Sequence, residues 1–231
     1  MMIWYDYYYF ILVIPALLIS LWAQARVKST YSKMSRVMNS RGLTGAQAAS
    51  EVLRYYGITD VRLEQVSGTL TDHYDPKENV IRLSQGVYGA TSIAAVGIAC
   101  HEAGHAAQHA QAYKPISVRN MLLPVANIGS ASGLWIALIG LAMQWRILIL
   151  VGIVLYAFVA LFQLVTLPVE FDASSRALKV IEETGMLQGE EYAGAKKVLS
   201  AAAMTYVAAL LVSIMSLLRV ILRARGGGRK R

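Results

Sequence analysis

The sequence is poor in charged residues and in cysteine. Asp, Glu, Lys and Arg make up 16% of the 231 residues, and hydrophobic residues make up 56%. Because soluble domains carry roughly 25% charged residues, this composition excludes an ordinary soluble protein and predicts an integral membrane protein with a limited polar part. The single cysteine, Cys100, excludes an intrachain disulfide and a metal site built from several thiolates. We expect Cys100 to be a small packing residue.

Acidic residues are also too few to balance the basic ones, and the formal net charge is +8. Much of this charge lies at the C-terminus, where residues 223–231 form a basic tail. Such a cluster next to a spanning helix is typical of a contact with the lipid bilayer. No basic and aromatic stretch or recognition motif accompanies the tail, so we expect no nucleic-acid partner.

Four apolar runs are long enough to span a membrane, and they cover residues 7–23, 122–143, 147–167 and 199–222. The three-residue connection 144–146 forces the second and third runs into a helical hairpin. An even number of spans places both termini on one side and the polar segments 24–120 and 168–198 on the other. The basic residues after the first span favour a cytosolic location for the polar segments, whereas the basic tail favours the reverse. We expect a multi-pass cell-membrane protein whose polar segments face the cytoplasm.

The polar segments have the pattern of a small α+β unit. Thr44 and Gln47 form a capping-box pattern that opens a helix ending near Gly57. Residues 61–66 and 79–83 alternate as strands do, and the second is either a buried strand or an exposed edge that could pair with an extended peptide. Ser92 can cap a helix that runs to about Ala112. The predicted fold is therefore a single domain, 1–231, mainly α, with about four transmembrane helices and a short β-sheet.

A short motif, His101-Glu-Ala-Gly-His105, lies in the last of these helices. On a helix, His101 and His105 are one turn apart on one face, so both imidazoles can bind one metal ion. Glu102 is placed to take a proton from a water molecule activated by the metal. The motif predicts a zinc hydrolase, and the alternative is a pair of core histidines beside a buried glutamate.

A catalytic zinc ion normally has a third protein ligand. His109 continues the four-residue spacing, but it lies about 9 Å along the helix axis from a metal between the first two histidines, which argues against it as a ligand and favours a supporting or surface position. Glu170 follows the third span, and Pro168 can begin a helix that carries it. A carboxylate at the start of a helix is also explained by the helix dipole, so both interpretations of Glu170 stay open. The other acidic residues of this segment fit a solvated face: Glu182, Glu183, Glu190 and Glu191.

A resemblance to a known family bears on this choice. The segments that carry it are Asp72-His-Tyr-Asp75, Val80-Ile-Arg-Leu-Ser84, Ala99-Cys-His-Glu-Ala-Gly-His105 and Leu167-Pro-Val-Glu-Phe-Asp-Ala-Ser174. In these segments the chain resembles the bacterial YugP family of membrane zinc metallopeptidases and, more distantly, the HtpX and CAAX prenyl protease superfamily. The resemblance implies a zincin-like catalytic part in which Glu170 is the third zinc ligand. The superfamily has an aspartate where this chain has Ser174, so support for the site must come from Ser174, Asp172 or elsewhere.

Together these observations predict a zinc metalloendopeptidase that cleaves membrane or membrane-proximal proteins, with Zn2+ bound by His101, His105 and Glu170 and with Glu102 as the general base. His73, Tyr74 and Arg176 are candidates for stabilising the oxyanion, and the sequence does not separate them. One alternative is a non-catalytic scaffold that holds zinc structurally, for which His73 or His109 would have to supply a fourth ligand. Another is an intramembrane protease, but the spans lack a Leu-Asp-Gly motif. The sequence makes no prediction of the oligomeric state.

Overall fold

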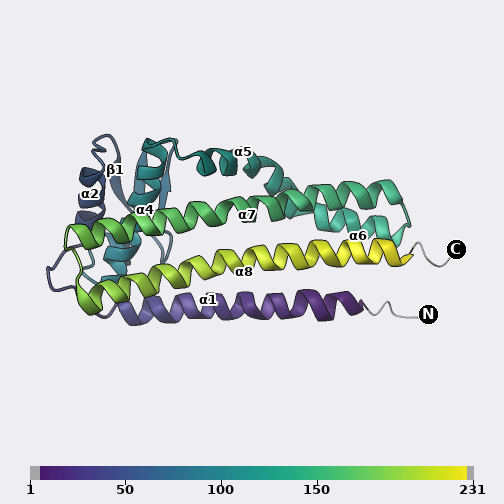
Figure 1. The fold of residues 1–231 in the computed structure, drawn as a ribbon, viewed down its shortest axis with the longest axis horizontal. Helices are drawn as coiled ribbons and strands as arrows, with labels where there is room; N and C mark the ends of the chain where they lie inside the picture. The colour runs from purple at the N-terminus through teal and green to yellow at the C-terminus, as the bar shows by residue number, and fades with distance from the viewer. Residues whose placement is uncertain (1–5, 228–231) are drawn as a thin grey trace. The chain divides into compact units, whose positions relative to one another are not determined.

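A computed structural model describes residues 6–227 and confirms the predicted fold class, with four candidate membrane-spanning helices and one small mixed sheet. The elements follow one another as η1 (Tyr9–Val13), α1 (Ile14–Met34), α2 (Gly45–Tyr55), β1 (Arg62–Val66), β2 (His73–Asp75), β3 (Val80–Ser84), α3 (Gln85–Tyr88), α4 (Ile93–Ala110), α5 (Lys114–Ile128), η2 (Gly129–Gly133), α6 (Leu134–Ala142), α7 (Arg146–Glu183) and α8 (Gly189–Gly227), where η denotes a π-helical segment (Figure 1).

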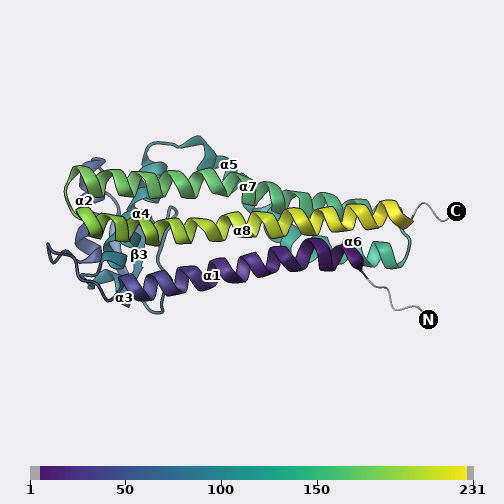
Figure 2. The ribbon, with the colours of Figure 1, turned by 60° about the horizontal axis from the view of Figure 1, so that its bottom comes forward.

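The helices long and apolar enough to cross a membrane cover Tyr9–Met34, Lys114–Ala142, Arg146–Glu183 and Gly189–Arg225. They extend beyond the apolar runs of the sequence, because α1, α7 and α8 continue without a break into the polar segments (Figure 2).

The expected helix start at Pro168 is wrong, since Pro168 lies inside the 38-residue helix α7. An internal proline costs roughly 3 kcal/mol through a lost hydrogen bond and a steric clash. After Pro168, however, the helix buries Val169, Ala173 and Ala177 completely, and this packing favours its continuation.

The chain forms two compact units, which are described separately. The first contains the residues up to Gln24, Ser117–Leu167 and the residues from Thr205 onward, and the second contains Ala25–Ile116 and Pro168–Met204. The second unit is thus built from the two polar segments, to within a few residues of the boundaries expected from the sequence.

In the first unit, the short turn between α6 and α7 produces the expected helical hairpin. The two helices pack so closely that a methyl group on Gly152 would lie 2.4 Å from the backbone nitrogen of Ala137, and one on Gly140 would lie 2.6 Å from that of Ile149. Only glycine fits such an approach, because a Cβ atom would overlap the backbone of the neighbouring helix.

The beginning and the end of the described chain also meet in the first unit. The Asp6 carboxylate accepts hydrogen bonds from Arg219 Nε and Arg223 Nη1, each at 2.8 Å. Asp6, which precedes the first candidate span, therefore lies beside the last turns of α8.

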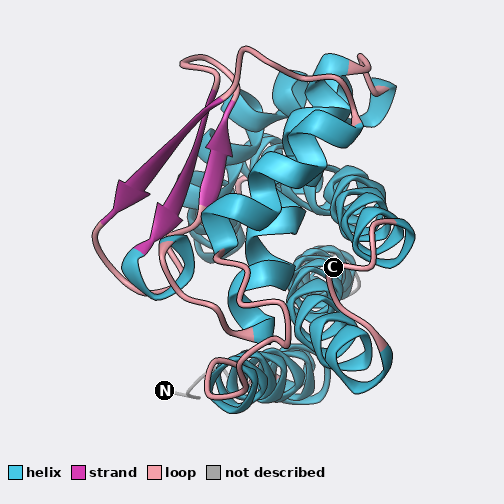
Figure 3. Ribbon diagram, turned by 90° about the vertical axis from the view of Figure 1, so that its left-hand side faces the viewer, coloured by secondary structure: helices cyan, strands magenta, loops and turns pink. Residues whose placement is uncertain are grey.

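In the second unit, three strands form a sheet in the order β1-β3-β2 (Figure 3). The central strand β3 pairs parallel with β1 and antiparallel with β2, and four of its five residues are buried. Of the two interpretations of residues 79–83, the exposed edge is therefore wrong and the buried strand is correct. The strand β2 was not predicted, because three polar residues give no alternating pattern.

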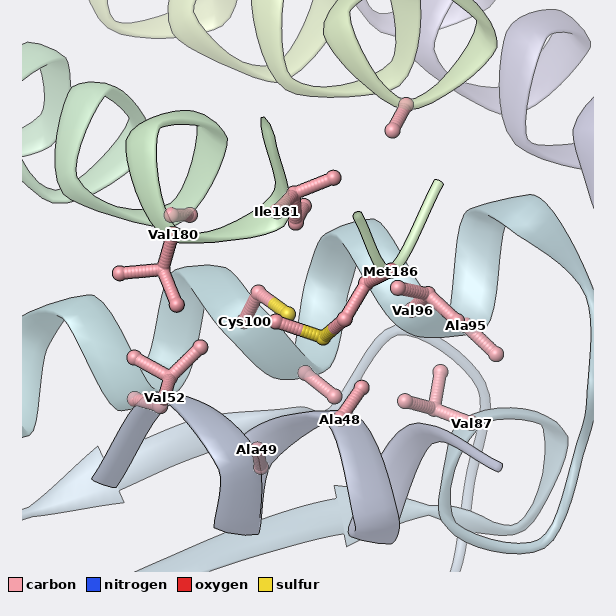
Figure 4. Close-up of a cluster of buried hydrophobic side chains, with 14 of the residues drawn as sticks. Ala48, Ala49, Val52, Val87, Ala95, Val96, Cys100, Val180, Ile181 and Met186 are labelled. Carbon is pink, nitrogen blue, oxygen red and sulfur yellow. The ribbon is translucent and has the colours of Figure 1, made fainter. Parts of the chain in front are cut away.

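Side chains from α2, β3, α4, α7 and α8 form one core in this unit. The fully buried Cys100 lies within it among Ala48, Val52, Val96 and Met186 (Figure 4). Both expected caps are present: Thr44 and Gln47 form the capping box of α2, and Ser92 caps α4. The core holds α4 against α7, and these are the two helices that carry the candidate site.

Candidate metal centre

The helix α4 places the first two candidate ligands on one face. It begins where Ser92 Oγ accepts a hydrogen bond from Ala95 N at 3.2 Å, and its alanine-rich sequence favours a helix. The imidazoles of His101 and His105 are one turn apart, and their ring centroids are separated by 4.7 Å. Each is mostly buried, with 15% and 12% of the side chain exposed.

The third candidate, Glu170, reaches the same point from α7. Its Oε2 atom lies 3.4 Å from His101 Nε2 and 3.6 Å from His105 Nε2, and 5% of its side chain is exposed. One ligand atom from each of the three residues lies within 4.8 Å of the others. The expected trio is thus together in space, and within residues 6–227 no fourth histidine, cysteine or carboxylate joins it.

The spacing and chemistry of this cluster fit a zinc ion. Zinc binds imidazole nitrogen and carboxylate oxygen at about 2.0–2.2 Å with tetrahedral geometry, which places neighbouring ligand atoms roughly 3.3 Å apart. The two distances to Glu170 are close to this value. Three ligands leave one tetrahedral position for water, as in catalytic rather than structural zinc sites.

A glycine allows the two helices to approach at the site. A Cβ atom on Gly104 would lie 2.5 Å from the carbonyl oxygen of Ala173, so any side chain there would collide with the α7 backbone. Gly104 therefore lets Glu170 reach both histidines, and this explains the glycine within the motif.

The residue Ser174 contacts the first histidine. Its Oγ atom lies 3.1 Å from His101 Nδ1, and the residue is 9% exposed. The hydroxyl thus contacts the ring nitrogen on the far side from the cluster and leaves His101 Nε2 facing Glu170.

The second histidine has a partner that sequence reasoning missed. Gln108 Oε1 lies 3.0 Å from His105 Nδ1, while Gln108 Nε2 donates to Val169 O at 2.7 Å and to Asp172 Oδ2 at 2.8 Å. The spacing in the sequence could have pointed to Gln108, because a residue three places after His105 on a helix lies on the same face.

The charge of Glu170 also affects the second histidine. Burial lowers the pKa of His105, but the hydrogen bond to Glu170 and the negative charges of Glu102 and Glu170 more than offset this, so its pKa is raised. The carboxylate of Glu102, the expected base, is close enough to contribute to this effect, and the residue is 9% exposed. It is not one of the three clustered ligands.

The remaining histidines lie outside the cluster. His109 Nδ1 is 3.3 Å from the Tyr74 hydroxyl, which donates to Asn79 Oδ1 at 2.8 Å. His73 is exposed, and its Nδ1 lies 2.8 Å from the carbonyl oxygen of Thr71.

The third oxyanion candidate, Arg176, donates to Asp172 and Gln111. Two of the acidic residues expected on a solvated face accept hydrogen bonds from other segments of the chain. Glu183 accepts from the Tyr55 hydroxyl, and Glu191 accepts from the backbone N–H of Ser40. Neither of these acids is part of the cluster.

The chain is similar to known proteins over most of its length. The family described as "Putative neutral zinc metallopeptidase" matches residues 9–225. The "Putative membrane protease YugP" of Bacillus subtilis (strain 168) is 48% identical over 211 residues, which cover 91% of this chain and 94% of that protein. No solved structure matches the chain significantly. The range matched by the family model, 9–225, spans the four apolar helices and the three clustered residues, and the chain therefore belongs to the "Putative neutral zinc metallopeptidase" family.

Proposed function

We propose that the protein is a membrane zinc metalloendopeptidase in which His101, His105 and Glu170 bind the ion and Glu102 is the general base. The observation that carries this proposal is the convergence of two Nε2 atoms from α4 and one carboxylate oxygen from α7. The same convergence supports Zn2+ as the cofactor, because imidazole and carboxylate are its usual ligands in catalytic sites.

In this proposal the protein itself supplies the group that transfers protons, Glu102. A zinc ion held by His101, His105 and Glu170 would supply a Lewis acid that polarises a peptide carbonyl and makes water acidic. The Glu102 carboxylate is close enough to His105 to raise the pKa of that imidazole, so it lies near the cluster and would accept the proton of the attacking water. The same carboxyl group then donates this proton to the leaving amine.

A structural zinc site in a non-catalytic scaffold is the main alternative. Such sites are normally closed by four protein ligands. The cluster has three members among residues 6–227, and the two histidines that could have completed it, His73 and His109, bond to Thr71 and Tyr74 instead. This favours the catalytic alternative.

We expect the substrates to be membrane proteins or segments close to the membrane. The support is that Glu170 lies on the same unbroken helix, α7, as an apolar segment long enough to cross a membrane. A cytoplasmic location of the site is supported by Arg26, Lys28 and Lys33, which follow the first apolar run.

The test combines metal analysis with a peptidase assay on the purified protein in detergent. We expect about one zinc ion per chain and cleavage of a membrane-protein substrate. Glu102→Gln is expected to retain zinc and to lose about 10²- to 10⁴-fold in kcat. Glu182→Gln makes the same chemical change at an exposed position and should leave activity unchanged.

Two outcomes would contradict the proposal. If the wild type and Glu102→Gln both retain zinc and neither cleaves the substrate, the scaffold is favoured. Equal cleavage of a soluble unstructured protein and of any membrane substrate would contradict the assignment of the substrate class.

A further inference from the structure

Gln108 is a fully buried polar residue whose side-chain groups all have partners. Its amide contacts His105 Nδ1, the carbonyl oxygen of Val169 and the carboxylate of Asp172. The second and third of these groups belong to α7, the helix that carries Glu170. Gln108 therefore connects one candidate ligand to the helix of another without belonging to the cluster.

The directions of these hydrogen bonds follow from the two acceptors. A carbonyl oxygen and a carboxylate can only accept, so the NH2 group of Gln108 must face α7 and use both of its hydrogens there. The carbonyl oxygen Oε1 then faces His105 and can only accept, so the proton of the neutral imidazole is on Nδ1. The lone pair is left on Nε2, which is the atom that faces Glu170.

The hydrogen bonds that run from His105 through Gln108 to Asp172 end at the guanidinium of Arg176. Arg176 Nε donates to the same Asp172 oxygen that accepts from Gln108, and Arg176 Nη1 donates to Gln111. The guanidinium also lies over the rings of Tyr56 and Tyr113, at 5.9 and 5.7 Å from their centroids. The bond to Arg176 therefore orients the Asp172 carboxylate, and with it the amide of Gln108.

We propose that Gln108, oriented by Asp172 and Arg176, is a positioning residue that fixes the tautomer and ring orientation of His105 for metal binding. The inference rests on the proposed zinc site. Ser174 does not have the same effect on His101, because a hydroxyl can donate as well as accept and so imposes no direction. The two histidines are thus supported unequally, and the constraint on direction falls on His105.

Zinc affinity measured by competition with a chelator tests this role without relying on activity. Gln108→Met keeps a similar volume but removes all three hydrogen bonds. We expect its zinc affinity to fall by about 10- to 100-fold, as is typical when a group supporting a metal ligand is lost. Gln65→Met makes the same chemical change on the exposed face of β1 and should bind zinc like the wild type.

A pair of isosteric substitutions separates hydrogen-bond direction from packing. Gln108→Glu places a second carboxylate against Asp172 and removes both donors to α7, so zinc affinity should fall. Adding Asp172→Asn exchanges the amide and the carboxylate, so that position 172 donates and position 108 accepts both from it and from His105, although the donor to Val169 O stays lost. We expect the double variant to recover at least tenfold of the lost affinity, because His105 Nδ1–H again meets an acceptor held in place.

The outcomes distinguish this proposal from the zinc site on which it rests. A wild-type protein that binds no zinc would overturn the metal site itself. Tight wild-type binding together with unchanged affinity in Gln108→Met would overturn only the role of Gln108. A double variant that binds zinc no better than Gln108→Glu would show that the direction of the hydrogen bonds does not matter.

Discussion

The hydroxyl of Ser174 is a weaker partner for a zinc-binding histidine than a carboxylate would be. It offers one neutral acceptor at 3.1 Å from His101 Nδ1, whereas a carboxylate adds charge and raises the basicity of the imidazole. Asp172, two residues before Ser174 on α7, does not replace that carboxylate, because its bonds go to Gln108 and Arg176.

Removal of this hydroxyl should weaken zinc binding without abolishing it. In Ser174→Ala, His101 Nδ1–H loses its acceptor inside a mostly buried site, and we expect about a tenfold loss of zinc affinity, the lower end of the usual range. The control is Ser175→Ala, because Ser175 is the exposed neighbour on the same helix. Equal affinities in the two variants would contradict this prediction.

Zinc affinity should also depend on pH through His105. Its pKa is raised above the usual 6.5 in the metal-free protein, because the hydrogen bond to Glu170 and the nearby carboxylates outweigh the effect of burial. Zinc binds only the neutral imidazole, so affinity should be constant above the raised pKa and should fall by about tenfold per pH unit below it. The decline should therefore begin above pH 6.5. Affinities measured between about pH 5 and 8 would contradict this if they did not change.

At the scale of the elements, the site depends on the close approach of α4 and α7. Gly104→Ala would place a methyl group 2.5 Å from Ala173 O, so one helix must move. Overpacking of this kind costs about 1–3 kcal/mol in unfolding free energy. Because the histidines and Glu170 lie on opposite helices, we also expect weaker zinc binding, measured together with the thermal unfolding midpoint.

The same helix offers a matched control for this substitution. A Cβ atom on Gly97 would lie 3.4 Å from Ala195 Cβ, which is an ordinary contact. Gly97→Ala should therefore leave zinc binding unchanged and should stabilise α4 by up to about 1 kcal/mol, since alanine favours helices over glycine. A Gly104→Ala variant as stable and as tightly zinc-bound as Gly97→Ala would show that the approach is not tight.

The sequence predicts these elements well where one local signal dominates and poorly where packing decides. Thr44 and Ser92 carry their own hydrogen-bond chemistry, so both helix starts were predictable. Pro168 carries an equally clear local signal, but burial of the following residues overrides it. The central place of β3 depends on pairing with β2, which is too short to be recognised from its own residues.

A similar division applies to the candidate site. The motif alone pairs His101 with His105, whereas Glu170 needed the number of spans and the resemblance, because no local spacing links residues so far apart. Gln108 could not be selected, since its acceptors on α7 become neighbours only in the folded chain.

At the scale of the whole molecule, a buried ion cluster joins the two ends of the described chain. Asp6 is 12% exposed and pairs with Arg219 and Arg223, while Arg219 also lies 4.8 Å from the Tyr9 ring centroid. Burial raises the pKa of Asp6, but the hydrogen bond to Arg219 and the two positive charges lower it below its usual value. This cluster therefore stabilises the fold at neutral pH, and its contribution is lost only as the pH falls through the lowered pKa.

Neutralising this carboxylate should destabilise the protein. Asp6→Asn removes the negative charge that both partly buried arginines face, and we expect a loss of about 1–3 kcal/mol in unfolding free energy at neutral pH. The thermal unfolding midpoint in detergent measures it. Asp6→Glu keeps the charge and should retain most of the stability. If both variants unfold like the wild type, the ends of the chain are not held together by this pair.

The positions of the metal ligands along the chain have one more consequence. His105 and Glu170 are separated by about 65 residues, and this segment contains the whole α5–η2–α6 region and the apolar part of α7. A bound zinc ion would therefore be a cross-link that closes a loop passing twice through apolar helices. By the chain-entropy relation for cross-links, closing a loop of this length restricts the unfolded chain by about 4 kcal/mol. A zinc ion that activates water would then also stabilise the folded protein, and a chelator would remove both the activity and this stabilisation.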